Sequence, residues 1–159
     1  MHERADLIDE RTRFEDAYRQ HGARLWRSML LFTGDPEVAS DAVAEAFAQA
    51  IRRGTDVESV EAWVARAAYR IAAGEMQSRR RSGYPIVDTP YEMPERVHEL
   101  AAALATLSPK QRAAAVLHFR DRYTLAEVAE INGSTPSAVS VHLDRAKKKL
   151  RALLEETDA

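Results

Sequence analysis

Apolar residues recur at spacings of three and four along most of the chain, the period of helices with one buried face. In the first half this pattern predicts helices over about residues 12–33, 36–53 and 60–80, with a connecting loop at 54–60. Thr12 and Glu15 have the spacing of a capping box, and Asp35-Pro36 supplies a cap followed by a proline suited to a first helical turn. The first half is therefore predicted to be a three-helix bundle.

The segment that follows this bundle breaks the pattern. Residues 82–94, SGYPIVDTPYEMP, contain three prolines and one glycine and show no helical period. Apolar periodicity then resumes and continues almost to the C-terminus. We therefore predict an all-α protein with two small helical bundles joined by a flexible linker, the bundles spanning 12–81 and 96–156 and the linker 82–95.

The strongest local signal is in residues 124–151, TLAEVAEINGSTPSAVSVHLDRAKKKLR. Thr124 and Glu127 form a capping-box spacing, Asn132-Gly133 is a helix stop, and Thr135-Pro136 starts another helix. This order predicts a helix-turn-helix, whose second helix would enter a DNA major groove. Its outward residues are predicted to be Ser137, Ser140, His142 and Arg145. The alternative is a helical hairpin that only packs.

Composition narrows the class of protein. There is no cysteine, which excludes disulfides and thiolate metal sites, and the histidines lack metal-ligand spacing, so we expect no metal and no cofactor. No apolar run is long enough to span a membrane and the N-terminus does not resemble a signal peptide, so a soluble cytoplasmic protein is expected. The net charge is −2, but basic residues gather at 79–81 and 145–151. Local basic patches of this kind favour phosphate binding.

The order of these segments resembles the extracytoplasmic-function (ECF) group of bacterial RNA polymerase sigma factors. Residues 107–154, from LSPKQR to RALL, resemble region 4, which binds the minus-35 promoter element. GDPEVASDAVAEAFAQAIRR resembles regions 2.1 to 2.2, which dock on core RNA polymerase, and EAWVARAAYRIAAGEMQSRRR resembles regions 2.3 and 2.4, which open and read the minus-10 element. The resemblance implies a transcription initiation factor that binds core polymerase and promoter DNA, without catalytic activity of its own.

The resemblance also implies site residues. Those for polymerase binding are Asp41, Glu45 and Phe47; those for minus-10 DNA are Arg66, Tyr69, Arg70, Arg79, Arg80 and Arg81; those for minus-35 DNA are Thr135, Ser137, Ala138, Ser140, His142, Arg145, Lys147 and Lys148. Trp63 matches the family's tryptophan but is expected in the core, and Tyr69 is open between base stacking and packing. The family pattern is broken at Ala44, Arg70, Gly74, Ser140 and His142, and by the loop acids Asp56 and Glu58 with Glu61 beyond.

Other functions remain as alternatives. The departures favour a sigma-like interaction module that needs an accessory regulator or binds an anti-sigma factor, without initiating transcription alone. A stand-alone helix-turn-helix repressor would leave the aromatic N-terminal bundle unexplained. Catalysis by Asp41 and Glu45 is disfavoured, since both lie on one solvated helix face without a partnered histidine.

Overall fold

The computed structural model describes residues 2–83 and 94–158, and over these ranges it contains helices and no strand. The first bundle holds α1 (His2–Thr33), α2 (Pro36–Arg53), the short 3₁₀ helix η1 (Gly54–Asp56) and α3 (Val60–Arg81). The second holds α4 (Glu95–Ala105), α5 (Pro109–Ala115), the π-helical turn η2 (Val116–Arg120), α6 (Leu125–Asn132) and α7 (Pro136–Asp158). The predicted all-α class is confirmed; residues 84–93 of the predicted linker lie outside the described residues.

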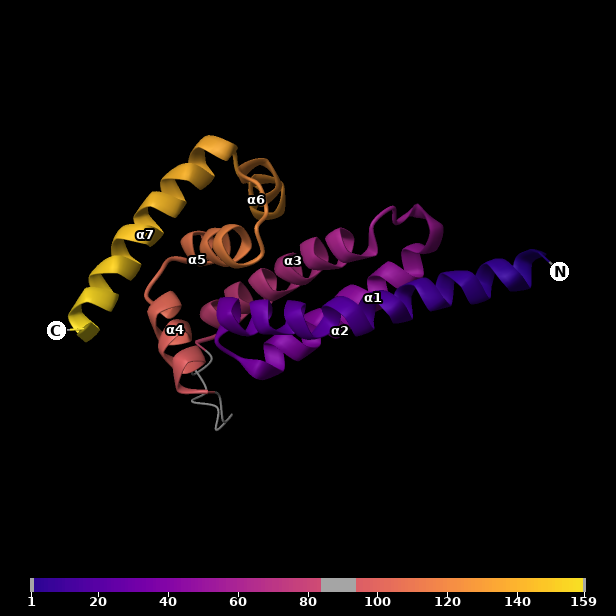
Figure 1. Ribbon diagram of the computed structural model, residues 1–159, viewed down its shortest axis with the longest axis horizontal. Coiled ribbons are helices and arrows are strands. Elements are labelled where there is room, and N and C mark those ends of the chain that lie inside the picture. Colours follow the sequence, from indigo (N-terminus) through magenta and orange to yellow (C-terminus); the bar gives the residue numbers. More distant parts are fainter. Residues whose placement is uncertain (1, 84–93, 159) are drawn as a thin grey trace.

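The helix predicted to start at Thr12 starts ten residues earlier, at His2. Thr12 does not cap it, because its hydroxyl donates to the carbonyl of Ile8 one turn back, at 2.9 Å. The prediction was wrong because a Thr and a Glu three positions apart also occur inside a continuous helix. The N-terminal turns of α1 extend beyond the rest of the bundle (Figure 1).

The other predicted helix starts in this half are confirmed, and each has a local cause. The Asp35 carboxylate accepts hydrogen bonds from the backbone N–H groups of Glu37 (2.9 Å) and Val38 (3.3 Å), with Pro36 in the first turn of α2. The Ser59 hydroxyl accepts from Ala62 at the start of α3. These caps fix where the helices begin and so how α2 and α3 pack beside α1 (Figure 1).

The second bundle contains the predicted helix-turn-helix. Thr124 and Glu127 form a complete capping box at the start of α6, and Gly133 ends that helix in the left-handed conformation with φ 61°. The Thr135 hydroxyl then accepts from the N–H of Ala138 at 3.2 Å in the first turn of α7. Buried Val128, Val139 and other apolar residues hold α6 against α7.

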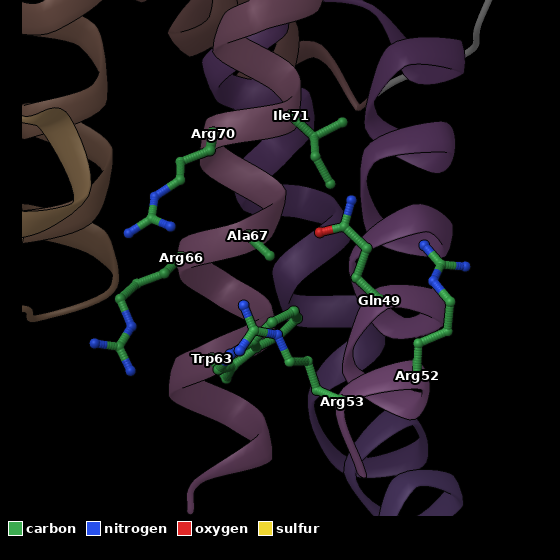
Figure 2. A pocket seen from close by; sticks show the side chains of 8 residues that line it. All are labelled: Gln49, Arg52, Arg53, Trp63, Arg66, Ala67, Arg70 and Ile71. Atoms are coloured by element: carbon green, nitrogen blue, oxygen red, sulfur yellow. The ribbon is translucent and has the colours of Figure 1, made fainter. Parts of the chain in front are cut away.

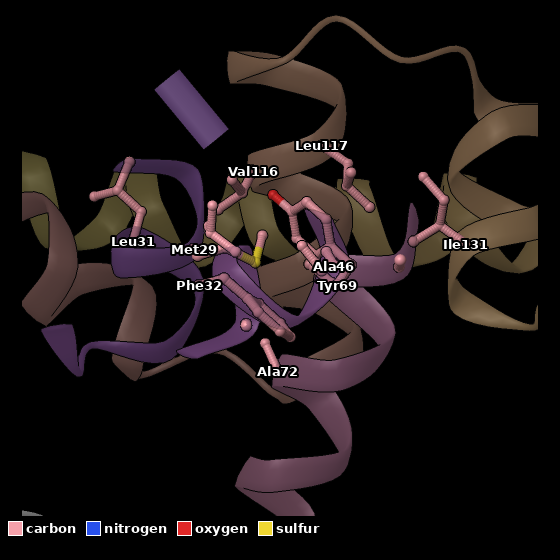
Figure 3. Packing of buried hydrophobic residues seen from close by; sticks show 14 of the residues in the cluster. Met29, Leu31, Phe32, Ala46, Tyr69, Ala72, Val116, Leu117 and Ile131 are labelled. Carbon is pink, nitrogen blue, oxygen red and sulfur yellow. The ribbon is translucent and has the colours of Figure 1, made fainter. Parts of the chain in front are cut away.

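The two bundles pack against each other. One buried apolar cluster runs from Met29 and Phe32 of α1 to Val116 and Leu117 at the start of η2 and Ile131 of α6 (Figure 3). α1 contacts α4, α5 and η2, and α3 contacts α6. The chain is therefore closed, with the helix-turn-helix bundle lying on α1 and α3. Within the described ranges, no helix combines the length and apolarity needed to cross a membrane.

Candidate nucleic-acid interface

An open groove of about 860 Å³ lies between α2 and α3. Four arginine side chains and one indole border it, together with a glutamine and smaller apolar groups (Figure 2). Its lining residues are Gln49, Arg52, Arg53, Trp63, Arg66, Ala67, Arg70 and Ile71. Guanidinium groups around an aromatic face provide the combination that binds a single nucleic-acid strand, with phosphates on the cations and bases on the ring.

Sequence reasoning found half of these arginines. Arg66 and Arg70 were predicted from the family resemblance, whereas Arg52 and Arg53 were not singled out. Both lie in the last turn of α2, directly before the η1 loop. The sequence signal that could have identified them is a pair of basic residues at the junction of a helix and the loop that leads to Trp63. The positive charge of Arg52 is partly neutralised, because its guanidinium donates a hydrogen bond to the Glu45 carboxylate at 2.9 Å.

The three acidic residues expected to repel DNA have different surroundings. Asp56 and Glu58 are exposed, but the Glu61 carboxylate lies 3.4 Å from Nε2 of His21 on α1. The Arg13 guanidinium donates to the carbonyls of Val57 and Glu58 and so ties this loop to α1. None of the three acids lines the arginine groove.

Two residues that were predicted to bind minus-10 DNA instead contact the second bundle. Tyr69, left open between base stacking and packing, is 2% exposed, and its hydroxyl donates to Oδ2 of Asp121 at 3.3 Å. Burial, and then the Asp121 carboxylate, raise the pKa of Tyr69 well above its ordinary value. The Arg66 guanidinium is paired with the Glu130 carboxylate of α6 at 2.9 Å. Packing is therefore the role of Tyr69 in this closed arrangement.

The arginine block 79–81 is not uniform. Arg79 is half-buried and binds Asp35, the cap of α2, at 2.6 Å and Glu75 at 3.1 Å. Arg80 and Arg81 are exposed at the end of α3. Arg79 thus has a structural part in joining α3 to α2, and its two neighbours are the groups open to a phosphate.

The predicted polymerase-binding residues divide in a similar way. Asp41 and Glu45 are both exposed on α2. Hydrogen bonds from Gln49 and Arg52 lower the pKa of Glu45, which keeps this carboxylate charged. Phe47 is buried and meets the ring of Tyr18 edge-on at 5.2 Å between centroids. The acidic pair is available to a protein partner, and Phe47 supports the bundle beneath.

Most predicted minus-35 residues are exposed on α7. They are Ser137, Ser140, Arg145, Lys147 and Lys148, with Thr135 exposed at the cap and Ala138 half-buried. His142 was expected to face outward but is half-buried, and its shielded Nδ1 has no hydrogen-bond partner among the residues that the structure describes. Burial, with the charges of Lys110 and Arg145, lowers the pKa of His142. The side chain of His142 is therefore a neutral imidazole at pH 7.

Comparisons with known proteins show which sequences this chain resembles. The family model described as "Sigma-70, region 4" matches residues 98–150. The chain is 30% identical over 154 residues to the ECF RNA polymerase sigma factor SigL of Mycobacterium tuberculosis, covering 87% of each chain. It is 28% identical to SigM of the same species, over 96% of this chain and 86% of that one.

Two solved structures have the same fold. The sigma factor RpoE, in complex with the anti-sigma factor NepR from Bartonella quintana, matches with a TM-score of 0.74 and 20% identity, over 89% of this chain and 96% of that one. CnrH, in complex with the cytosolic domain of CnrY, matches with a TM-score of 0.73 and 21% identity, over 96% and 94%. Each match extends over both helical bundles.

Proposed function

The chain belongs to the ECF RNA polymerase sigma factors, and from this membership we propose how its two bundles divide the work of transcription initiation. The N-terminal bundle, residues 12–81, binds core RNA polymerase and the minus-10 element. The C-terminal bundle, residues 96–156, binds the minus-35 element, and the linker 82–95 lets them reach both. The protein acts in the cytoplasm and contributes binding, without a catalytic step or cofactor of its own.

The observation that carries the minus-10 assignment is the arginine groove. Arg52, Arg53, Arg66 and Arg70 surround Trp63 between α2 and α3. An opened promoter presents one strand with phosphates along its edge and bases free to stack, which this groove matches in charge and in aromatic surface. Arg80 and Arg81 lie further along α3, where they would contact duplex phosphates upstream.

The minus-35 assignment rests on α7. Its exposed serines at 137 and 140 lie in the half of the helix that would enter the major groove, and Arg145, Lys147 and Lys148 follow toward the C-terminal end. The hydroxyls are short donors and acceptors for base edges, and the cations would bind phosphates on either side. Neutral His142 would contribute packing and at most one hydrogen bond.

Polymerase binding is assigned to the acidic face of α2. Asp41 and Glu45 are exposed one turn apart, so a basic helical partner can pair with both. The proposal is tested with purified core polymerase and the double variant Asp41→Ala/Glu45→Ala. We expect binding to weaken about tenfold or more, which corresponds to about 1.4 kcal/mol. Glu37→Ala, an exposed acid of the same helix, is the control and should bind as the parent does.

In vitro transcription with sigma-free core polymerase over a library of promoters tests the function itself. The proposal predicts initiation at a consistent pair of upstream elements. A purified, folded protein that never joins core polymerase would contradict it. That outcome would favour the alternative, a sigma-like module that acts only with an accessory regulator.

We also propose an anti-sigma partner for this chain. The solved structure of RpoE holds the anti-sigma factor NepR, and that of CnrH holds the cytosolic domain of CnrY. Co-purification from the native host distinguishes the outcomes. Recovery of a small protein partner supports regulation of this type, and recovery of core polymerase alone argues against it.

A further inference from the structure

The exposed side of α7 carries a valine among polar and charged side chains. Val141 is 47% exposed and lies outside the buried apolar cluster. With 3.6 residues per turn, it lies on the opposite side of the helix from buried Val139, Leu143 and Ala146. Its exposed neighbours on this outer side are Ser137, Ser140, Asp144, Arg145 and Lys148. Val141 therefore lies at the centre of the face that α7 presents to the outside.

This outer side of α7 is open to a ligand. α4, α5 and α6 all contact α7, and they lie along one side of it in Figure 1. Asp144 belongs to the open side: it is exposed, and its carboxylate takes no part in the ion pairs that join the described residues. Val141 and Asp144 can therefore both contact a molecule that approaches α7 from outside.

Helix stability does not account for a valine at position 141. A β-branched residue has a lower helix propensity than alanine or leucine, and an exposed one gains little from burial of apolar area. The same branching makes the side chain stiff, so its two methyl groups are held at a fixed place on the outer side of α7. Little rotamer freedom is then lost when these methyl groups pack against a ligand.

Two groups on the base edges of the DNA major groove match these side chains. The C5 methyl of thymine is an apolar group, and the N4 amino group of cytosine is a hydrogen-bond donor. Valine supplies methyl groups for the first, and the aspartate carboxylate supplies only acceptors, as the second requires. A carboxylate is repelled by phosphate, so Asp144 would not contact the DNA backbone. Adenine also has an amino donor, but its neighbouring N7 is an acceptor that repels a carboxylate.

We propose that Val141 and Asp144 determine part of the sequence that α7 recognises. Val141 packs against the methyl group of a thymine, and Asp144 accepts a hydrogen bond from the amino group of a cytosine. This inference rests on the proposed function, in which α7 enters the major groove of the minus-35 element. The two residues are separated by about 4.5 Å along the helix axis, and base pairs follow one another every 3.4 Å or so. The thymine and the cytosine are therefore expected one or two base pairs apart.

Replacing thymine by uracil tests the contact of Val141. The probe is a DNA duplex that the full chain selects from a random library, and each of its thymines is replaced in turn by uracil, which pairs in the same way and lacks only the C5 methyl group. At one thymine we expect this replacement to weaken binding about fourfold, the effect of one buried methyl group. Val141→Ser, which removes both methyl groups, should bind the thymine and uracil duplexes equally. Fluorescence anisotropy of the labelled duplex measures both.

Two further variants serve as controls for this experiment. Val141→Thr keeps one methyl group at the same place and should retain part of the preference for thymine over uracil. Leu100→Ala removes an apolar side chain that is 46% exposed on α4, and it should retain all of the preference. The inference is overturned if the parent protein selects no common sequence, or if no uracil replacement causes a loss of binding that Val141→Ser abolishes.

Repeating the selection with Asp144 variants tests the second contact. Asp144→Ala should relax the preference for cytosine at a position one or two base pairs from the thymine. Asp144→Asn should shift that preference toward adenine, because an amide can bind both the N6 amino group and N7. Glu155→Ala, an exposed acid near the C-terminal end of α7, should select the same sequence as the parent. An unchanged selected sequence in both Asp144 variants would rule out the cytosine contact.

The proposed function and these base contacts fail separately. If the parent protein never binds core polymerase, the proposed function fails, whatever sequence the chain selects. If the protein initiates transcription and the uracil and Asp144 experiments show no effect, only the two base contacts are wrong.

Discussion

Asp35 shows how a single side chain can have one role that is visible from the sequence and another that is not. Its capping of α2 was predicted, because the N–H groups it accepts from are two and three residues away. Its ion pair with Arg79 of α3 joins residues 44 positions apart and has no local signature. A helix cap involves residues close together in sequence, so it can be predicted from the sequence. The contacts of the same side chain with a distant helix cannot.

Substitutions at Asp35 should separate these two contributions. Asp35→Asn keeps a good cap and loses the charge, and Asp35→Ala loses both. We expect Asp35→Ala to lower the free energy of unfolding by about 2–3 kcal/mol and Asp35→Asn by roughly half as much, because the charged hydrogen bond and the cap each contribute about 1–2 kcal/mol. Urea denaturation measures both. Asp41→Ala, which is exposed, should change stability by less than about 0.5 kcal/mol. No loss in Asp35→Asn would show that the ion pair contributes nothing, and equal losses in the two Asp35 variants would show that the cap contributes nothing.

Buried Tyr69 and half-buried Tyr123 predict how stability depends on alkaline pH. Burial and Asp121 raise the pKa of Tyr69 well above its ordinary value, and burial with the same carboxylate raises the pKa of Tyr123 to about 12. In the unfolded chain both ionise near pH 10, so above that pH the unfolded state binds fewer protons than the folded state. The stabilisation is therefore complete below pH 10 and is lost as the pH rises toward 12.

This expectation is checked by urea denaturation at a series of pH values. The free energy of unfolding should fall more steeply above pH 10 in the parent than in Tyr123→Phe, which cannot ionise at that position. A surface tyrosine provides the control: Tyr18→Phe should leave the slope unchanged, since Tyr18 is 59% exposed. A parent protein whose stability is flat from pH 9 to 12 would be inconsistent with the raised pKa values of Tyr69 and Tyr123.

At the scale of whole elements, the sequence predicted most helix boundaries correctly. α2, α6 and α7 each begin at a predicted cap, and Gly133 ends α6 where expected. The start of α1 was wrong because a chance Thr12–Glu15 spacing imitates a cap. The π-helical turn η2 was missed, since no residue pattern specifies a shift from one helical hydrogen-bond register to another.

The lysines in the middle of α7 carry the clearest element-level prediction. Replacing Lys147, Lys148 and Lys149 together by alanine should weaken binding to every DNA sequence and reduce the salt dependence of binding. The logarithmic slope should fall by about 0.9 for each phosphate that the variant no longer neutralises. Lys147 lies 5.4 Å from the Phe119 ring and Lys149 is 3.4 Å from the Thr106 carbonyl, so Lys148 should account for the largest single share.

A matched substitution nearer the N-terminus of α7 distinguishes base recognition from phosphate binding. Ser140→Ala should alter which sequences are preferred and leave the salt slope as it is. Selection from a random DNA library, repeated at two salt concentrations, measures both quantities. Weaker binding to one sequence alone after removal of the lysines would contradict phosphate binding.

At the scale of the molecule, the closed packing of the two bundles could not be predicted. The bonds that create it join residues 52 to 96 positions apart, among them Tyr69 to Asp121 and Arg24 to Arg120. Polar residues such as Ser28 look like surface positions in a helical pattern, and their burial depends on a partner supplied by the other half of the chain. This is also why the sequence left Tyr69 open between base stacking and packing.

Arg112 joins the ends of helices from both bundles. Its guanidinium donates to the carbonyls of Leu104 (3.0 Å), Ala105 (3.3 Å) and Leu107 (3.2 Å) around the end of α4, and to Phe32 (3.0 Å) in the last turn of α1. Carbonyls at helix C-termini lack partners within the helix and carry the negative end of its dipole, so a cation there is stabilising. Burial, with the nearby charge of Arg80, lowers the pKa of Arg112, and the side chain stays charged because arginine titrates far above pH 7.

Arg112→Ala should lower the free energy of unfolding by about 3 kcal/mol, since it leaves several carbonyls without a donor in a half-buried site. Arg112→Lys should recover little, because one ammonium cannot reach the four carbonyls that the planar guanidinium spans. Urea denaturation followed by circular dichroism measures both, and Arg145→Ala, exposed on α7, should lie within about 0.5 kcal/mol of the parent. Because Arg112 links α1 to the second bundle, its loss should also broaden the transition as the bundles begin to unfold separately. A sharp, unshifted transition in Arg112→Ala would mean that the apolar contact alone holds the two halves together.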